Sequence, residues 1–202
     1  IEVRGQEELS GEFLAGFWHE DSLAMNLLLR RVASGGVRAT AVITADKRGD
    51  AIQRVISACG GEALRLSYDE GGMLSASRQL LSRLRKKGEN GEDGVGTALD
   101  GPLGPHREPK KFIFMLACKA GRRFVGVSVR YKRKIRLGWR WDKYVLPLPF
   151  GKLYFECHSF GRISPERLND FAGLSSEIRG AMLGSSSISR EAGRVEMADE
   201  CA

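Results

Sequence analysis

The amino-acid sequence predicts an α/β protein with a single domain, in which helices flank a mostly parallel central sheet. Apolar runs with strand character alternate along the chain with segments of helical periodicity, as they do in βαβ units. The length of 202 residues is enough for one domain with a sizeable core and is short for two. We therefore expect one α/β domain over residues 1–183.

The first half of the chain already shows this alternation. Strands are expected at residues 1–4, 13–17, 37–43 and 62–66. Apolar side chains at helical spacing predict helices at residues 23–32, 51–59 and 73–84. Gly60-Gly61 should end the second of these helices, because paired glycines stop a helix readily.

The second half continues the pattern after a polar turn at residues 88–94. We expect strands at 95–99, 124–131 and 152–158, and a helix at 112–120. Ser164-Pro165 supplies an N-cap and a proline at the first helical position, so one last helix should run to Met182. Residues 184–202 are small, polar and aperiodic, which predicts a disordered tail.

Charge and cysteine content limit the class of partner and the compartment. The 32 lysines and arginines outnumber 25 acidic residues, and the net charge of +7 favours an anionic partner such as phospholipid headgroups or nucleic acid. The four cysteines are far apart and include no C-x-x-C pair, so neither a metal site nor a disulfide framework is predicted. A reducing compartment, the cytoplasm, fits best.

Hydropathy bears on membrane attachment. No apolar run approaches the roughly 18 residues needed to cross a bilayer, and the strongest is residues 112–118. The chain that is present should be soluble or peripheral. It opens at Ile1 without a methionine, which is compatible with the loss of an upstream signal or membrane anchor.

The first candidate for chemistry is His19, in the motif Phe17-Trp18-His19-Glu20. It follows a predicted strand and precedes two carboxylates, Glu20 and Asp21, which could orient its ring and make it more basic. A histidine of this kind can take a proton from a hydroxyl nucleophile as a general base. The alternative is a histidine that only caps or satisfies the following helix.

The second candidate is a rigid turn that also follows a predicted strand, so both motifs should emerge at the end of the sheet. Its sequence is Asp100-Gly101-Pro102-Leu103-Gly104-Pro105. Prolines fix the backbone, and glycines let it turn tightly and approach a ligand. Arg107 and Lys110 follow, where a phosphate could sit at a helix N-terminus. A rigid loop with a solvated basic flank is the alternative.

Two further motifs are less specific. Gly71-Gly72 opens a helix and can cradle an anion, but no Gly-x-Gly precedes it and no P-loop lysine follows, which argues against kinases and dehydrogenases. The arginine- and tryptophan-rich segment 130–141 could bind nucleic acid, lie on an anionic bilayer, or form a solvated strand pair.

Taken together, several motifs resemble one family in their order and spacing. They are Val3-Arg4-Gly5, Phe17-Trp18-His19, Arg65-x-Ser67 followed by Gly71-Gly72, Asp100-Gly101-Pro102-x-Gly104-Pro105, and Trp141-Asp142-Lys143-Tyr144 followed by Leu146-Pro147-Leu148-Pro149-Phe150. This set is similar to the bacterial domain-of-unknown-function branch of the lysophospholipid acyltransferase superfamily. The resemblance covers roughly residues 2–163 and implies a glycerolphosphate acyltransferase-like fold.

The resemblance also implies an activity. An enzyme of this type moves a fatty acyl group from a thioester of acyl carrier protein or coenzyme A to a hydroxyl of a (lyso)phospholipid or related acceptor, and uses no other cofactor and no metal. His19 would be the base. The acceptor phosphate would be bound by a set that matches two motif blocks and their basic flank: Arg65, Ser67, Gly71, Gly72, Asp100, Gly101, Pro102, Gly104, Pro105, Arg107 and Lys110. We expect such an enzyme on the inner face of the cytoplasmic membrane, with no nucleic-acid partner.

One departure concerns the acid partner of His19. The superfamily pattern His-x-x-x-x-Asp places an acid where this chain has Ala24. Asp21 could replace it, Asp46 or Asp50 could come from a neighbouring loop, or histidine could act alone. The missing acid also favours a competing interpretation, a catalytically degenerate module that binds anionic lipid or acyl carrier protein.

Overall fold

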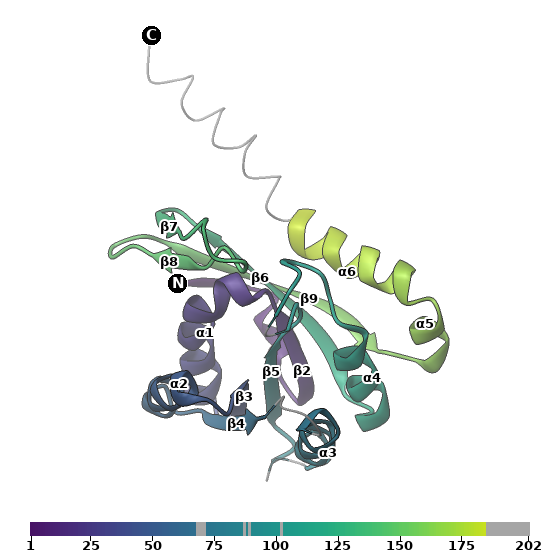
Figure 1. Cartoon of the computed structure of the whole chain (residues 1–202). Coiled ribbons are helices and arrows are strands. Elements are labelled where there is room, and N and C mark those ends of the chain that lie inside the picture. The colour runs from purple at the N-terminus through teal and green to yellow at the C-terminus, as the bar shows by residue number, and fades with distance from the viewer. Residues whose placement is uncertain (68–71, 87, 89, 102, 185–202) are drawn as a thin grey trace.

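The computed structural model describes residues 1–67, 72–86, 88, 90–101 and 103–184 and shows a mixed α/β domain (Figure 1). Seven strands form one sheet in the order β1-β9-β6-β2-β5-β3-β4, and neighbours are parallel except for β6 and β9. They are β1 (Glu2–Arg4), β2 (Glu12–Phe17), β3 (Arg38–Thr44), β4 (Glu62–Leu66), β5 (Asp93–Ala98), β6 (Arg123–Tyr131) and β9 (Leu153–Arg162). The predicted α/β class with a mostly parallel sheet is confirmed.

A separate two-stranded hairpin leaves the sheet between β6 and β9 (Figure 1). It pairs β7 (Lys134–Arg136) with β8 (Val145–Pro147) in antiparallel register. A loop of eight residues, 137–144, joins the two strands. We call residues 132–152 the hairpin segment. Because it replaces a crossover helix, β9 returns beside β6 in the opposite direction.

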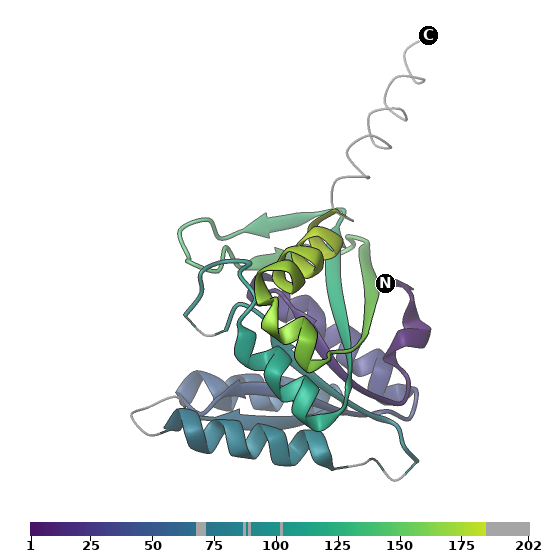
Figure 2. The same ribbon diagram turned by 90° about the vertical axis from the view of Figure 1, so that its right-hand side faces the viewer.

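Helices cover both faces of the sheet (Figures 1 and 2). They are α1 (Ser22–Ser34), α2 (Lys47–Ala58), α3 (Gly72–Arg85), α4 (Lys111–Ala120), α5 (Pro165–Asn169) and α6 (Phe171–Gly184), with short 3₁₀ helices η1 (Gln6–Leu9) and η2 (His19–Asp21). One core cluster lies under α3, α4 and α6 and includes Leu80, Phe114 and Ile178. The other lies under α1 and includes Leu28.

Several boundaries differ from the sequence prediction, among them the start of α2, which lies at Lys47 and not at residue 51 because Asp46 caps the helix. β5 begins at Asp93, inside the predicted polar turn, because this aspartate is buried and paired. The predicted strand at 152–158 extends to Arg162. The single helix predicted up to Met182 is broken at Asp170, whose ψ of 63° is not helical and whose side chain accepts a hydrogen bond from the N–H of Gly173. Residues 185–202, most of the predicted tail, lie outside the described residues.

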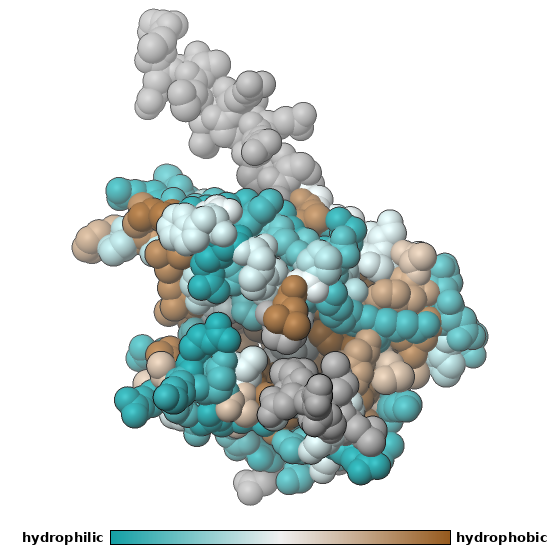
Figure 3. Space-filling view, viewed as in Figure 1, coloured by the Kyte–Doolittle hydropathy of each residue, from teal (hydrophilic) through white to brown (hydrophobic). Residues whose placement is uncertain are grey.

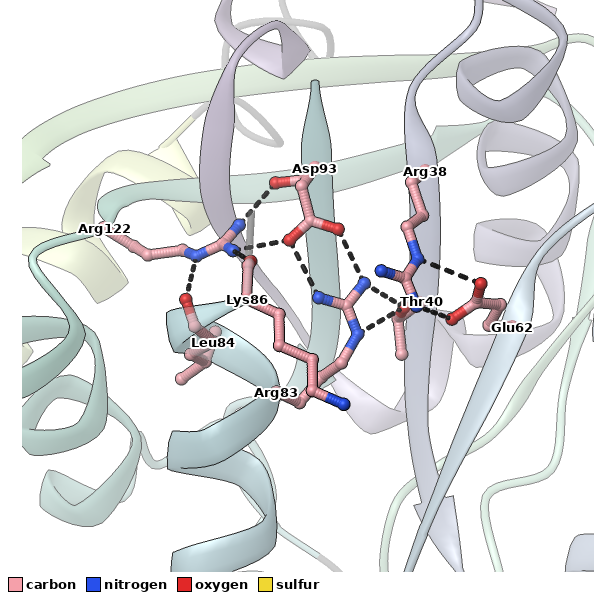
Figure 4. A network of polar contacts seen from close by, with 8 residues as sticks. All are labelled: Arg38, Thr40, Glu62, Arg83, Leu84, Lys86, Asp93 and Arg122. Carbon is pink, nitrogen blue, oxygen red and sulfur yellow. Dashed lines mark hydrogen bonds and ion pairs between the residues drawn. The ribbon is translucent and has the colours of Figure 1, made fainter. Parts of the chain in front are cut away.

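A buried ionic network fixes the start of β5 (Figure 4). The Asp93 carboxylate accepts hydrogen bonds from Arg83 at 2.7 and 2.8 Å and from Arg122 at 2.5 Å. Arg122 also donates to the carbonyl oxygen of Leu84 at 2.6 Å. Burial alone would raise the pKa of Asp93, but the two arginines hold it below its ordinary value. The network joins α3, β5 and the residue before β6 at the end of the sheet opposite the carboxyl ends of its parallel strands.

No helix within the described ranges is both long enough and apolar enough to span a membrane.

Candidate functional site

The chain changes direction in the sheet between β2 and β5. β2 leads through α1 to β3 on one side, whereas β5 leads through α4 to β6 on the other, and the two helices lie on opposite faces. β2 and β5 are parallel neighbours. Their carboxyl ends therefore form a topological switch point, the place where open α/β sheets bind ligands. His19 follows β2 and Asp100 follows β5, so the expectation that both motifs emerge at one sheet edge is confirmed.

Asp100 joins the two loops at this edge. Its Oδ1 atom accepts a hydrogen bond from the backbone N–H of His19 at 3.0 Å, and its Oδ2 atom accepts one from the N–H of Arg107 at 3.1 Å. The carboxylate is fully buried. Burial raises the pKa of Asp100, and the two N–H donors offset only part of that effect. Asp100 is thus a structural tie between the loops.

The loop after Asp100 depends on its glycines. Gly101 and Gly104 have φ angles of +64° and +73°, in the left-handed region that glycine adopts without strain. A Cβ atom at Gly104 would lie 2.7 Å from Cε3 of Trp141, so the indole packs directly on the loop backbone. Arg107 also has a positive φ of 59°, which is uncommon for a non-glycine residue and is found at functional sites.

Glu20 contacts three basic side chains of the site. Its side chain is only 1% exposed and lies 3.2 Å from Nε2 of His106. Its Oε1 atom accepts a hydrogen bond from Nε of Arg107 at 2.5 Å, and its Oε2 atom lies 3.4 Å from Nη2 of Arg136. Arg136 comes from β7, so this carboxylate joins the loop after β5 to the hairpin segment.

His19 presents an unsatisfied nitrogen. Its Nδ1 atom is buried and has no hydrogen-bond partner among the described residues, which is rare for a buried polar atom. The imidazole packs against the indole of Trp141, with the ring centroids 5.3 Å apart and the planes tilted by 57°. We call His19, Glu20, Asp100, Arg107 and Trp141 the switch-point site.

Asp142, which the sequence analysis names in a motif but gives no role, is an acid of this neighbourhood. It is fully buried and accepts hydrogen bonds from the Arg140 guanidinium at 2.8 Å to each oxygen. Those hydrogen bonds outweigh burial and lower the pKa of Asp142, and the nearby charge of His19 acts in the same direction. A lone acid between tryptophan and lysine in an otherwise basic segment is the signal that could have identified it.

Asp21, the expected acid partner of His19, contacts a different residue. Its Oδ1 atom accepts a hydrogen bond from the Tyr131 hydroxyl at 2.7 Å, and no described contact joins it to the His19 ring. Burial, reinforced by the charge of Glu20, raises the pKa of Asp21 to about 7. The physical reason lies in η2: a 3₁₀ helix has three residues per turn, so His19, Glu20 and Asp21 point in three directions.

The other candidate acids also have partners elsewhere. Asp46 caps α2, where the N–H of Gly49 and the guanidinium of Arg48 lower its pKa to about 2. Asp50 binds Arg65 at 2.5 Å. Arg65 lies at the end of β4, two strands from β5, and also donates to the Asp46 carbonyl oxygen. Among the described contacts, none joins this group to the switch-point site.

The remaining predicted residues lie around these two groups. Ser67 is exposed after β4, and Gly72 begins α3. Lys110 is the N-cap residue of α4, and its aliphatic stem lies close to Gly101. Pro105 is exposed in the loop after β5. Gly71 and Pro102 lie outside the described residues.

No described group of three or more histidine, cysteine or acidic side chains is arranged to hold a metal ion. Two shallow surface hollows lie over α3 and over α2, and neither includes a residue of the switch-point site. In comparisons by sequence, no family model matches this chain, and neither does any curated protein.

Proposed function

We propose that this protein is an acyltransferase that moves a fatty acyl group from an acyl thioester to a hydroxyl of a (lyso)phospholipid or related lipid, with His19 as general base. The observation that carries the proposal is the buried, unpartnered Nδ1 of His19 at a topological switch point. The motif resemblance to the lysophospholipid acyltransferase superfamily supports the same reaction. The donor would be an acyl thioester of coenzyme A or acyl carrier protein, used as co-substrate.

The step is direct acyl transfer. The acceptor hydroxyl oxygen attacks the thioester carbonyl carbon while the imidazole of His19 takes the hydroxyl proton. Collapse of the tetrahedral intermediate breaks the carbon–sulfur bond, and the proton passes from the imidazolium to the leaving thiolate. The products are an ester and a free thiol, so no acyl-enzyme is required. Asp142 is a buried acid that its hydrogen bonds to Arg140 chiefly keep ionised, with a smaller contribution from the charge of His19, and this suits it to stabilise the imidazolium.

The acceptor phosphate would lie beside the same histidine. Arg107 and Arg136 meet at Glu20, and Lys110 is at the N-terminus of the ten-residue helix α4. Two guanidiniums exceed the charge of one carboxylate, so the group retains a positive charge for an anion. Backbone N–H groups at a helix start add to that attraction. A lipid acceptor places the enzyme at the inner face of the cytoplasmic membrane as a peripheral protein.

The direct test is mass spectrometry of lipids after incubation of the protein with mixed acyl thioesters and candidate acceptors. His19→Ala should lower product formation by about 10²- to 10⁴-fold and leave the circular dichroism spectrum unchanged. The matched control is His158→Gln, because His158 bonds Ser128 at 3.1 Å on β6 and β9, away from the site. Full activity of His19→Ala, or equal loss in His158→Gln, would overturn the assignment of the base.

One observation favours a second candidate, a catalytically degenerate module that binds anionic lipid or acyl carrier protein. Ala24 stands where the superfamily pattern has an acid, and it is fully buried in the apolar cluster under α1 with Leu28 and Val32. The position has therefore become part of the core. Consumption of acyl thioester separates the two candidates, because a module would bind lipid or carrier and release no thiol.

A further inference from the structure

The hairpin segment, residues 132–152, holds most of the net charge of the chain. It contains seven lysines and arginines and one acid, so it accounts for six of the seven net positive charges. The acid, Asp142, is buried against Arg140. Lys132, Arg133 and Lys143 are exposed and have no acidic partner among the described residues. The surface of the hairpin is therefore strongly cationic.

The same segment exposes large apolar side chains. Phe150 is fully exposed, Trp139 is 82% exposed, and Ile135 and Trp141 are also exposed. Leu103, in the loop on which Trp141 packs, is 89% exposed. Figure 3 shows hydrophobic surface over β7 and β8 set among hydrophilic residues. Side chains of this size are normally buried in a soluble domain, so a cluster of them on one element marks a contact surface.

The two properties together match one kind of partner. Tryptophan settles at the headgroup level of a bilayer, phenylalanine and aliphatic side chains enter the acyl boundary, and lysine and arginine bind anionic headgroups. A nucleic-acid site would present aromatic rings on which bases can stack. The exposed aliphatic side chains of Ile135 and Leu103 would contribute nothing to such stacking. The combination of protruding aliphatic and aromatic side chains with unpaired cations favours lipid.

The hairpin is also attached to the switch-point site. Arg136 contacts Glu20 from β7, and Trp141 contacts the His19 ring and the backbone of Gly104. Figure 2 shows the loop after β5 and the loop between β7 and β8 on the same side of the molecule. A bilayer bound by the hairpin would therefore lie next to His19, where a membrane lipid would have to enter.

We propose that the β7–β8 hairpin docks this protein on anionic lipid bilayers, with Trp139 and Phe150 inserted at the headgroup level and the exposed lysines and arginines of residues 132–152 bound to lipid phosphates. The inference rests on the proposed function only in that acyl transfer to a lipid explains why the protein would bind a membrane. Its test measures docking without catalysis.

The test is co-sedimentation with vesicles of phosphatidylcholine alone and of phosphatidylcholine mixed with phosphatidylglycerol. The unsubstituted protein should bind the mixed vesicles, and salt should weaken the binding. The double variant Trp139→Ala/Phe150→Ala should bind about tenfold or more weakly. The control is Ile52→Ala/Val55→Ala on α2, where two apolar side chains that are 41% and 45% exposed lie outside the hairpin and binding should not change.

Fluorescence gives a second readout that does not depend on the folding of a double variant. Trp18 is buried, so quenching by brominated lipid should come from Trp139 and Trp141. The variant Trp139→Phe should lose most of that quenching while it still binds the vesicles.

Two results would overturn the docking. They are failure of the unsubstituted protein to bind mixed vesicles, whether or not it binds acyl carrier protein or an oligonucleotide, and equal loss in the α2 control. Vesicle binding without acyl transfer would instead count against the proposed function alone.

Discussion

The backbone N–H of His19 donates a 3.0 Å hydrogen bond to Oδ1 of Asp100, although 81 positions separate the two residues in the chain. The other oxygen of the same carboxylate accepts from the N–H of Arg107. Two loops that follow different strands are thus held by one buried side chain. The position of the histidine backbone therefore depends on the side chain of a residue far away in the chain.

Asp100→Ala should destabilise the fold. It would leave the part-buried N–H groups of His19 and Arg107 without a partner, at a cost of up to about 1–3 kcal/mol for each donor. Urea denaturation should show the lower free energy of unfolding. Glu2→Ala is the control. Its carboxylate is exposed and its ion pair with Lys152 is long, at 4.0 Å, so the pair contributes little to stability. Equal losses in the two variants would show that Asp100 is no tie.

Asp93→Ala should be more damaging than any surface ion-pair variant. Removal of this carboxylate leaves the buried guanidiniums of Arg83 and Arg122 uncompensated, a change that typically costs about 3–5 kcal/mol. Glu62→Ala breaks the neighbouring exposed pair with Arg38, also drawn in Figure 4, and should cost about 1 kcal/mol or less. Similar denaturation midpoints for the two variants would contradict this account of the network.

Gly104→Ala should disturb the loop more than its backbone conformation alone explains. Gly91 has nearly the same φ, +71° against +73°, but an added Cβ there meets nothing within 4 Å. Gly91→Ala therefore measures the cost of the left-handed conformation by itself. The excess loss in Gly104→Ala, about 1–3 kcal/mol, would come from the clash with Trp141. No excess in thermal or urea unfolding would mean that the indole yields freely.

Asp21 should give the protein a measurable pH dependence of stability. Its pKa is about 7 when folded against an ordinary 3.8, so the folded state binds the proton more tightly. The stabilisation is complete below about pH 3.8 and is lost as the pH rises through about 7, with a slope of at most about 1.4 kcal/mol per pH unit. Asp21→Asn should flatten this slope and raise the stability at pH above about 7.

The control for this effect is Asp46→Asn. The pKa of Asp46 is lowered to about 2, so its contribution has the opposite sign and changes only at acid pH. Between neutral pH and about pH 5, Asp46→Asn should shift the stability curve without changing its slope. Urea unfolding of both variants across this range checks the prediction, and an unchanged slope in Asp21→Asn would contradict it.

Hydrophobic periodicity was sufficient to predict most of the sheet. β2, β3, β4 and β6 lie within one residue of their predicted bounds, because their apolar runs are continuous and bounded by polar turns. The start of β5 was not predictable in this way. Aspartate is typical of turns, and the sequence alone does not show that Arg83 and Arg122 pair with Asp93 and allow it to be buried in a strand. The same holds for Asp170, where a side-chain hydrogen bond ends one helix and starts the next.

The site was predictable where it depends on strand ends and not where it depends on the hairpin. His19 and Asp100 follow two strands, so their proximity follows from a parallel sheet. Trp141 and Asp142 reach the site only because the segment after β6 folds back. No periodicity in the sequence of this segment predicts that it folds back toward His19. The direction of Asp21 depends on the three residues per turn of η2, which apolar spacing cannot reveal.

Trp141 has a mechanical consequence for this edge of the molecule. The indole touches the His19 ring on one side and leaves no room for a side chain at Gly104 on another. A shift of the hairpin would therefore press on the imidazole or on the loop after β5. The hairpin, the loop and the histidine ring are mechanically coupled through Trp141, so a movement of β7 and β8 would be transmitted to the imidazole.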